Sequence, residues 1–418
     1  MVDSRRLIMP VAIRGLLARE WLSSRIVYNP LADAFHQNPY PKYARLRGRD
    51  PLHWSHLVKG WVLTRHEDCD EVLRDYKRWS NAERLQEGSD AEPALANDAP
   101  SMLFVDPPDH TRLRGLVNKA FTPRAIEQLK PRIAEIVTEI IESLPEDDPV
   151  DLMEVLAFPV PVIVIAEMLG VPAEDRDDFK RWSDPVARTL EPTITPEETK
   201  AAQAAFAELS QYFEQIVAER AKEPREDLVS ALIAAEESGD RLSHGELLST
   251  LRLLLVAGNE TTTNLIGNGM LALLNNPDQL ERLRQNMGLM ENAVEELLRY
   301  DSPVQTDGRT ALEDVEMYGK TIRKGQRVLT LLGSANRDPR VFANPNKLDI
   351  GREEIRHLAF ARGIHHCLGA PLARAEGQAV FRALLETFPR IELAEAPRYK
   401  DHVVLRGLKS LRVRLHRS

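Results

Sequence analysis

The chain has very little cysteine: Cys69 and Cys367 are its two thiols in 418 residues. A lone disulfide between residues so far apart would be an odd framework for a chain of this size, so the sequence favours a reducing compartment and a cytoplasmic protein. Positive charge is also in deficit, since 55 Lys and Arg residues against 64 Asp and Glu residues give a net charge of −9. A general nucleic-acid-binding surface needs concentrated positive charge, and we expect none.

Long apolar runs, linkers and internal repeats are lacking as well. The apolar run from Leu7 to Ile13 is followed by Arg14 and has no evident small-residue cleavage site, which argues against a signal peptide. The run from Phe158 to Ala166 is far shorter than the roughly 20 residues that a membrane-spanning helix needs. We therefore expect no membrane anchor, and one monomeric domain over residues 1–418 whose residues 1–27 form an N-terminal extension.

Helical periodicity dominates what is present, and short β-type runs flanked by turn residues are a minor part. The pattern predicts a mostly α protein of the α+β type, a helical frame with small sheets. Thr122–Pro123 and Asn276–Pro277 are typical of an N-cap followed by the first helical turn. The predicted helices are 123–144, 151–169, 196–222, 243–275, 277–286, 290–300 and 367–387, and the predicted strands are 60–64, 315–318, 327–332, 402–405 and 410–415.

One cysteine stands between two glycines just before a helical pattern. Residues 360–369 read Phe-Ala-Arg-Gly-Ile-His-His-Cys-Leu-Gly. A thiolate at Cys367 would gain from backbone N–H groups and from the positive end of the helix dipole. Gly363 and Gly369 would let a large planar ligand approach the backbone closely, and Phe360 would pack beside the sulfur and keep water away.

This segment is similar to the haem-binding signature of the cytochrome P450 family, Phe-Gly-x-Gly-x-His-x-Cys-x-Gly. The resemblance implies that the Cys367 thiolate is the metal ligand of haem b (iron protoporphyrin IX) and favours O–O cleavage. It places Phe360 and Gly369 beside the cofactor and implies the P450 fold, a helical frame around a buried haem. Ala361 stands where the family usually has Gly, and this departure puts the loop and its hydrogen bonds to the thiolate in question.

Two plainer interpretations compete for the same segment, a buried structural cysteine and a zinc site. His357, His365, His366 and Cys367 are close together in sequence and are all zinc-ligand types. A closed zinc site usually takes four ligands with more than one cysteine, whereas the P450 signature accounts for Phe360, the glycines and His365 together. The haem interpretation is therefore preferred, pending its structural context.

Residues 243–275 read as one long helix interrupted at Ala257–Thr262. The glycine in that stretch costs about 1 kcal/mol of helix propensity, while a carboxylate and adjacent Thr hydroxyls can open the backbone ladder and hold water. A kinked core helix with a buried Glu is the plainer alternative. The stretch resembles the P450 motif Ala-Gly-x-Asp/Glu-Thr-Thr, which implies that Ala257 lies at the haem and that Glu260 and Thr261 are catalytic, relaying protons to bound dioxygen.

A carboxylate and a guanidinium three residues apart share a helical face at Glu296 and Arg299 and can pair there. Spacing alone does not single them out, because Glu281 and Arg284 are spaced identically, and we expect those two to lie on a solvated face. The resemblance favours Glu296 and Arg299 as a structural pair, and Arg337 would complete their network.

Haem carries two propionates, which need cationic or hydrogen-bonding partners when they are buried. Four basic residues from three separate segments match P450 propionate-binding positions. Taken singly they would be ordinary surface residues, but together they support haem. They are His110, Arg114, Arg309 and His365.

The resemblance implies an apolar substrate site with one amide. The function it implies is insertion of one oxygen atom from O2 into a hydrophobic organic molecule, by hydroxylation or epoxidation. A peroxide-driven P450 and a non-catalytic haem sensor or carrier are the alternatives. The residues expected to line the site are Leu253, Val256, Ala257, Thr261, Val304, Gln305 and the loop around Leu95 to Phe104.

No flavin or iron–sulfur segment is visible in the chain. By analogy with the family, electrons should come from a ferredoxin or flavodoxin and its NAD(P)H reductase. A basic patch near the cysteine would receive such an acidic partner. Its expected members are Arg112, Lys119, Arg352, Arg356 and Arg362.

Overall fold

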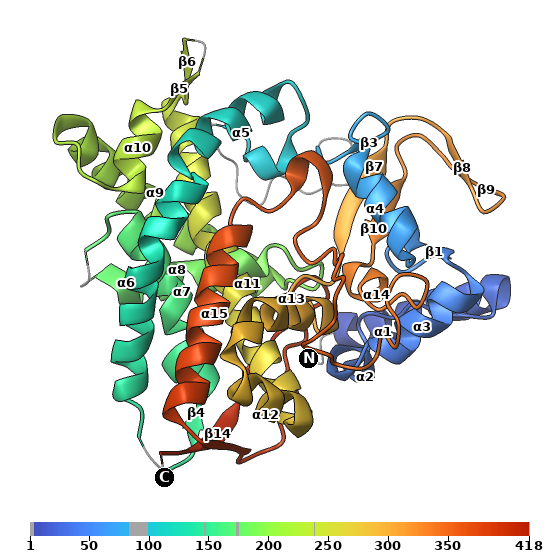
Figure 1. The fold of residues 1–418 in the computed structure, drawn as a ribbon. Helices are drawn as coiled ribbons and strands as arrows, with labels where there is room; N and C mark the ends of the chain where they lie inside the picture. Colours follow the sequence, from blue (N-terminus) through green and yellow to red (C-terminus); the bar gives the residue numbers. More distant parts are fainter. Residues whose placement is uncertain (1–3, 83–98, 146–147, 173–174, 238, 418) are drawn as a thin grey trace.

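The protein was analysed as a computed structural model that describes residues 4–82, 99–145, 148–172, 175–237 and 239–417 (Figure 1). Helices fill one side of the molecule, and the largest sheet lies on the other side with the N-terminal helices. The α-helices are α1 Ser4–Ser24, α2 Asp33–Gln37, α3 Tyr40–Arg49, α4 His66–Arg74, α5 Asp109–Ala120, α6 Pro123–Glu142, α7 Pro159–Met168, α8 Arg176–Arg188, α9 Pro196–Lys222, α10 Leu228–Ala234, α11 His244–Leu274, α12 Pro277–Gln285, α13 Met290–Tyr300, α14 Leu332–Ala335 and α15 Ala370–Thr387.

The sheets are small, as the sequence predicts. A five-stranded sheet has the order β1-β2-β10-β7-β3, in which β10 runs parallel to β2 and the other pairs are antiparallel. A three-stranded sheet, β11-β14-β4, lies close to the C-terminus. The strands are β1 Leu52–Ser55, β2 Gly60–Leu63, β3 Trp79–Ser80, β4 Val150–Asp151, β5 Glu236–Glu237, β6 Asp240–Arg241, β7 Asp307–Ala311, β8 Val315–Met317, β9 Lys320–Ile322, β10 Arg327–Thr330, β11 Arg390–Leu393, β12 Arg398–Tyr399, β13 Leu408–Ser410 and β14 Arg412–His416.

Local capping chemistry accounts for several helix starts. The Thr122 side chain accepts a hydrogen bond from the backbone N–H of Ala125, which confirms the predicted start of α6. The predicted helix start at Asn276–Pro277 is confirmed in position, but the Asn276 side chain makes no capping hydrogen bond and its amide donates back to the carbonyl of Ala272. The long helix α11 begins with a capping box in which Ser243 and Glu246 satisfy each other's backbone N–H groups.

The helix predicted over 151–169 is broken into pieces in the structure. A short strand β4 and a π-helical turn, Met153–Ala157, precede α7. Pro159 and Pro161 cannot donate backbone hydrogen bonds and stand in the first turn of α7, where no partner is needed. The expected interruption of α11 at Ala257–Thr262 is also absent, since the helix continues without a break through that stretch.

Other differences concern elements that periodicity did not reveal. Residues 402–405 do not form a strand; Leu405 makes only an isolated bridge to Val304. The strands β1 and β7 and the helices α3, α4, α5 and α8 were not predicted. Strands of four or five residues inside a partly buried sheet leave little period-two signal, so periodicity alone does not find them.

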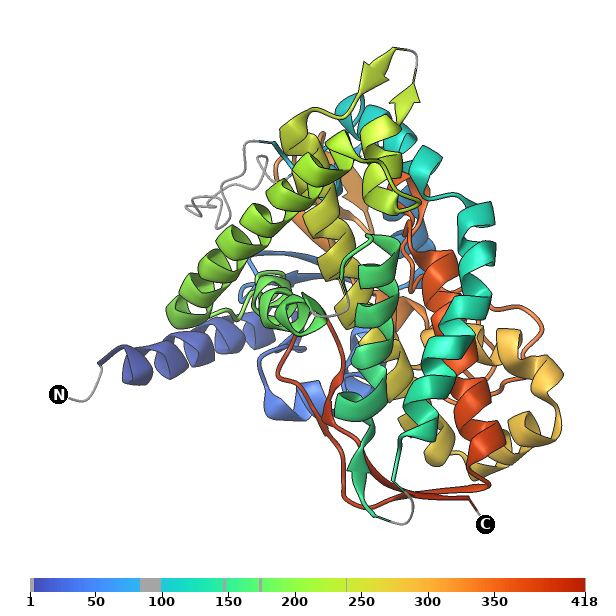
Figure 2. The same cartoon turned by 90° about the vertical axis from the view of Figure 1, so that its left-hand side faces the viewer.

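The longest helix, α11, passes through the centre of the protein. It packs against α7, α8, α13 and α15, and Figure 2 shows it enclosed by neighbouring helices. Most of its residues between 247 and 273 are buried. Close approach to α15 depends on Gly269, because a Cβ there would lie 2.5 Å from the Phe381 ring.

The predicted pair of Glu296 and Arg299 forms one fully buried ion pair on α13. Arg299 donates from Nε and Nη2 to the two carboxylate oxygens of Glu296, at 2.7 and 2.8 Å. Its remaining N–H groups donate to the carbonyls of Asn336, Pro345 and Lys347. One side chain thus holds the irregular segment 336–347 against α13, where no regular structure satisfies those carbonyls.

The third member of this network is Arg352 and not Arg337. Arg352 donates to Glu296 at 3.0 Å, whereas Arg337 donates to the carbonyl of Tyr300 and stacks on its ring. The pair with the same spacing on α12 also differs from expectation. Arg284 is mostly buried and donates to the carbonyls of Leu385 and Phe388 at the end of α15.

The N-terminal extension forms α1, which projects from the body of the protein at its N-terminal end (Figure 2). Its other end is anchored by Glu20, whose buried carboxylate accepts from the ring of His53 at 2.8 Å and from the hydroxyl of Ser55. Among the described residues, no helix is both long and apolar enough to cross a membrane.

Truncation of Arg299 should be strongly destabilising. In Arg299→Ala the buried Glu296 charge and three carbonyls lose their partner, so we expect the free energy of unfolding to fall by about 3–5 kcal/mol. Arg323→Ala, which removes an arginine that is 70% exposed and paired with Asp314, should change it by no more than about 0.5 kcal/mol. Urea unfolding followed by circular dichroism measures both; equal effects would contradict the assigned role of the buried pair.

Candidate functional site

The segment that carries Cys367 is a tight loop directly before α15. The backbone N–H of Cys367 donates to the carbonyl of Phe360 at 3.0 Å, which closes the loop. Gly363 has a positive φ of +72°, and a Cβ there would lie 2.4 Å from the carbonyl oxygen of Leu73. Only glycine fits this position, because the conformation is left-handed and the backbone of α4 leaves no space.

Ala361, the departure from the family signature, also has a positive φ, +53°. A left-handed conformation costs a non-glycine residue about 1–2 kcal/mol. The methyl group packs against the second hydrophobic cluster of the protein, with Leu358 and Leu73 among its buried members. The loop therefore keeps the backbone conformation that glycine would adopt, at some cost in conformational energy.

The thiol of Cys367 is solvent-accessible, yet protein atoms surround it closely enough that burial raises its pKa. The residue is therefore accessible although protein atoms lie close around its sulfur. Backbone N–H groups of Gly369 and Ala370 and the guanidinium of Arg114 act in the other direction and lower that pKa. A Cβ on Gly369 would meet no atom within 4 Å, so the backbone beside the sulfur is open to a ligand.

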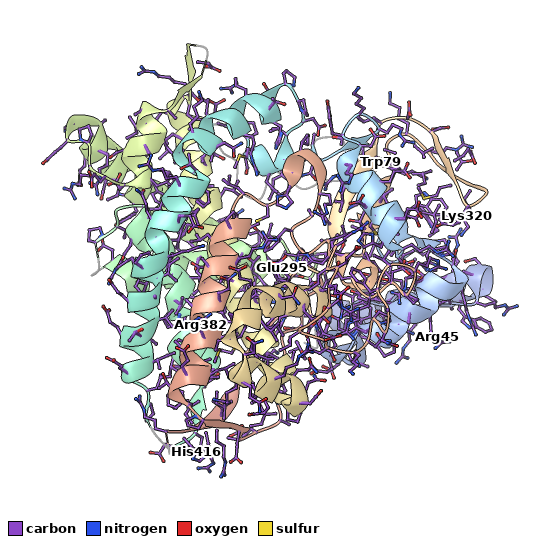
Figure 3. All side chains as sticks on the ribbon, viewed as in Figure 1. Arg45, Trp79, Glu295, Lys320, Arg382 and His416 are labelled. Atoms are coloured by element: carbon purple, nitrogen blue, oxygen red, sulfur yellow. The ribbon has the colours of Figure 1, made fainter. Side chains whose placement is uncertain are left out.

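Zinc ligation at this segment is not supported. Among the described residues, no group of three or more His, Cys, Asp and Glu side chains is arranged to hold a metal ion. His357 is buried and bonded to Glu295, which also accepts two hydrogen bonds from Arg374. Figure 3 shows Glu295, a residue of α13, near the centre of the molecule. The Arg374 guanidinium in turn lies 4.6 Å from the centre of the Phe360 ring and covers the loop.

An accessible stripe interrupts the otherwise buried surface of α11. Leu253, Val256 and Thr261 are partly accessible and Ala257 is exposed, although this part of the helix is in the middle of the fold. Their spacing of three and four residues places them on one helical face. Leu253 and Val256 pack against the same hydrophobic core as Phe360. The predicted distal residues are thus brought together on one face.

Glu260 and Thr261 are adjacent in sequence but have different surroundings. The Thr261 hydroxyl donates to the carbonyl of Ala257 at 2.8 Å on the accessible stripe. The Glu260 carboxylate, 9% exposed, accepts from Lys400 at 2.7 Å and from Asn264 at 3.3 Å. Consecutive residues differ by about 100° around a helix, so the acid lies to one side of the stripe.

The four predicted propionate partners do converge. The rings of His110 on α5 and His365 in the cysteine loop lie 4.1 Å apart between centroids. Burial, together with the positive charges of His110, Arg309 and Arg114, lowers the pKa of His365 to about 3. Three segments distant in sequence therefore place basic side chains around one point.

These residues fit a buried dicarboxylate. Three buried N atoms of this cluster have no hydrogen-bond partner among the described residues: His110 Nδ1, His365 Nε2 and Arg309 Nη2. Arg114 uses one N–H group on the carbonyl of His366, the residue before the cysteine. Unpaired buried donors are costly, and carboxylates of a ligand would satisfy them. Haem has two carboxylates, which suit these nitrogen donors, and a metal ion, which suits the Cys367 thiolate. The residues present therefore fit haem.

The expected substrate lining is supported only in part. Val304 is partly accessible and bridges to Leu405. Gln305 is 3% exposed, donates to the carbonyl of Ser302 and accepts from the hydroxyl of Tyr43. Because both ends of its amide are used internally, Gln305 does not supply the polar group expected in the lining. In the loop around Leu95 to Phe104, residues 95–98 lie outside the described residues.

The ion-pair partner of Glu260, Lys400, could not be predicted from the sequence. Lys400 is 140 residues from Glu260 and belongs to an irregular segment, so no spacing rule connects the two. The side chain is placed by its backbone, whose N–H donates to the carbonyl of Gly407. The buried carboxylate of Glu191 also accepts from the backbone N–H groups of residues 403–405 and fixes the segment.

Comparison with known proteins agrees with this geometry. The sequence profile of the cytochrome P450 family matches residues 61–406. The polyketide biosynthesis cytochrome P450 PksS of Bacillus subtilis is 41% identical over 94% of this chain and 99% of its own length, and its structure superposes with a TM-score of 0.86 over 93% of this chain and all of the other.

Two further relatives are similar over most of their length. Vitamin D(3) 25-hydroxylase of Pseudonocardia autotrophica is 44% identical over 91% of this chain and 94% of its own. The structure of cytochrome P450 CYP109Q5 from Chondromyces apiculatus gives a TM-score of 0.86 at 38% identity, covering 94% of this chain and 98% of that one. With the cysteine loop and the converging basic residues, these matches show that the chain is a P450 enzyme and belongs to the cytochrome P450 family.

Proposed function

We propose that this enzyme inserts one oxygen atom from dioxygen into a hydrophobic organic substrate, by hydroxylation or epoxidation, with haem b on Cys367. The observation that carries the proposal is the accessible stripe on α11: apolar at Leu253 and Val256, and ending at the Thr261 hydroxyl. Apolar walls suit an apolar substrate, and a single hydroxyl suits proton transfer at one place.

Each residue has a proposed task. Haem, when bound, would supply dioxygen activation at iron, and Cys367 would hold that iron through its thiolate. His110, Arg309 and His365 would hold the propionates through their unpartnered ring and guanidinium nitrogens, and Arg114 would add its guanidinium beside them. The alanine at position 257 leaves space beside the cofactor, and the apolar side chains of the stripe exclude water. Thr261 Oγ1 holds the proton that Glu260 supplies from the side of the helix.

The substrate class is proposed from the lining and from the relatives' names. The named functions of two relatives, polyketide biosynthesis and vitamin D(3) 25-hydroxylation, both concern large organic molecules. Val304, next to the segment that ends at Leu405, would add a further apolar wall. We propose a bulky apolar substrate held by few polar contacts, in a cytoplasmic, monomeric, single-domain enzyme.

Electrons are proposed to come from a ferredoxin or flavodoxin and its NAD(P)H reductase. Four of the five arginines and lysines expected in the basic patch pair with carboxylates of this protein. Arg352 is only 11% exposed and belongs to the Glu296 network. Arg112 pairs with Glu246 and Asp240, Arg356 with Glu354, and Arg362 lies 3.7 Å from Asp70. Lys119 makes no ion pair with a described residue and is the best remaining candidate.

The two rival functions are distinguished by the α11 residues. A peroxide-driven P450 does not need a proton relay for dioxygen, and such enzymes usually lack the acid–alcohol pair that Glu260 and Thr261 supply here. A carrier or sensor needs no relay at all. We therefore favour monooxygenation over both.

A titration of the ferric holoenzyme should identify the substrate class. Fatty acids, terpenoids, steroids and macrolides are added while the haem Soret band is followed, and at least one class is expected to shift the band toward the high-spin form. That compound should then stimulate consumption of NAD(P)H and dioxygen with ferredoxin or flavodoxin and a reductase. Product formed with peroxide alone, and with neither electron donor, would favour the peroxygenase.

Thr261→Ala should uncouple the reaction. We expect haem content and substrate affinity to be unchanged while product per NAD(P)H falls roughly tenfold and hydrogen peroxide rises, since the hydroxyl that holds the proton is lost. The matched control is Thr262→Ala, whose side chain is buried away from the stripe, at 2% exposure; its coupling should stay close to wild type. Unchanged coupling in Thr261→Ala would refute the assigned relay.

Cys367→Ser should abolish the thiolate signature of haem. The carbon monoxide complex of the reduced protein should lose its long-wavelength Soret band, because a hydroxyl does not replace the thiolate as a strong donor. Cys69, the other thiol, is fully buried in a hydrophobic cluster, so Cys69→Ser should keep the band. If Cys69→Ser lost the band while Cys367→Ser kept it, the assignment of Cys367 as the haem ligand would be wrong.

A further inference from the structure

One carboxylate on α13 contacts the chain on both sides of the cysteine. Glu295 lies 3.1 Å from Nε2 of His357, which precedes Cys367 at the start of the cysteine loop. It also accepts hydrogen bonds from Nε and Nη2 of Arg374, at 2.6 and 3.0 Å, near the start of α15. Glu295 therefore joins the two segments between which the proposed haem ligand is held.

The hydrogen bonds of His357 fix its tautomer. Its Nδ1 accepts from the backbone N–H of Ala359 at 3.2 Å, so the ring proton is on Nε2 and is donated to Glu295. Burial lowers the pKa of His357, in agreement with a neutral ring. Burial alone would raise the pKa of Glu295, but hydrogen bonds from His357 and Arg374 outweigh it and lower that pKa to about 2. Arg374 is thus the cation that balances the charge of this carboxylate.

The two partners of this carboxylate, His357 and Arg374, are also neighbours of Phe360. The centre of the Phe360 ring lies 4.6 Å from the guanidinium of Arg374 and 5.7 Å from the ring centre of His357. A planar guanidinium over an aromatic face is a favourable contact. The carbonyl of Phe360 accepts the backbone N–H of Cys367 at 3.0 Å. The position of the ring is therefore linked to that of the thiol through a single backbone hydrogen bond.

Glu295 acts separately from the structural pair next to it in the sequence. Glu296 bonds to Arg299 and Arg352, and in the hydrogen bonds of the described residues the two carboxylates share no partner. Glu295 is 27% exposed, whereas Glu296 is fully buried. Since a partly exposed ion pair contributes little to stability, a change at Glu295 can alter the cysteine loop without unfolding the protein.

We propose that Glu295 is a positioning residue for the haem ligand Cys367. It holds the guanidinium of Arg374 over the Phe360 ring, and the covered ring keeps water away from the sulfur. The inference rests on the proposed ligation of haem by this cysteine. A thiolate that meets water can take a proton from solvent and become a neutral thiol, which is a weaker metal ligand. Residues that orient a metal ligand typically affect metal affinity or activity 10–100-fold.

Glu295→Gln should make thiolate ligation less durable. One polar atom of the amide is itself a donor, so the amide cannot pair with the guanidinium as a carboxylate does, and Arg374 should leave the Phe360 ring. In the carbon monoxide complex of the reduced holoenzyme, the long-wavelength Soret band should decay about tenfold faster than in wild type. The control is Glu386→Gln, which removes the partner of Arg382 farther along α15; its band should decay at the wild-type rate.

Two further variants test whether Glu295 acts through the aromatic ring. Arg374→Lys keeps the positive charge but loses the planar fork, so it should resemble Glu295→Gln; decay at the wild-type rate would contradict the proposal. Phe360→Leu should by itself speed the decay about tenfold. The double variant of Glu295→Gln and Phe360→Leu should then decay no faster than Phe360→Leu. Independent effects would multiply to about a hundredfold and would overturn the proposal.

Haem content and urea unfolding separate this local role from a general loss of stability. Glu295→Gln should bind haem fully and unfold at the same urea concentration as wild type. A lower midpoint that accounts for the faster decay would make the role merely structural and refute the proposal. If wild type shows the long-wavelength band and Glu295→Gln keeps it equally long, the positioning role fails and the proposed function stands. If wild type shows no such band, thiolate ligation by Cys367 fails, and both proposals fail with it.

Discussion

The central position of α11 is the constraint on which the site depends. The helix is buried by α7, α8, α13 and α15 on most of its surface, so any side chain left accessible there borders internal space. One stripe from Leu253 to Thr261 is left accessible, on the hydrophobic core that also contacts the cysteine loop. Because the helix is fixed by packing on its other faces, the apolar side chains of the stripe keep their places without hydrogen bonds, and Thr261 adds one to the carbonyl of Ala257.

Buried charged side chains stabilise segments of the fold that are neither helix nor strand. Arg299 satisfies three carbonyls of the segment 336–347, and Glu191 satisfies the N–H groups of residues 403–405. An irregular segment lacks the regular hydrogen bonds that pair backbone groups in helices and sheets. A charged side chain with several donor or acceptor positions pairs those backbone groups instead. The cost of burying these charges is offset by the number of hydrogen bonds that each one makes.

The sequence predicted the elements and residues whose signals are local. Helices α9, α11 and α13 and the cap at Thr122 follow from periodicity and capping, and Cys367 and Glu296 from short motifs. It failed where partners come from distant segments. Arg352 and not Arg337 completes the Glu296 network. The polarity of Gln305 suggested a residue that faces the substrate, but the sequence does not show that its amide hydrogen-bonds within the protein. Such pairings are decided by packing, which periodicity does not contain.

The same limit applies to the motif on α11. Adjacent letters Glu260 and Thr261 suggest one joint relay, but the helix separates them by about 100°. The structure gives the acid a lysine and a charged cavity, and gives the alcohol a backbone carbonyl and an apolar stripe. The helix itself lies between the two environments. Neighbouring positions in the motif therefore do not share partners, and the role of each side chain has to be argued from its own contacts.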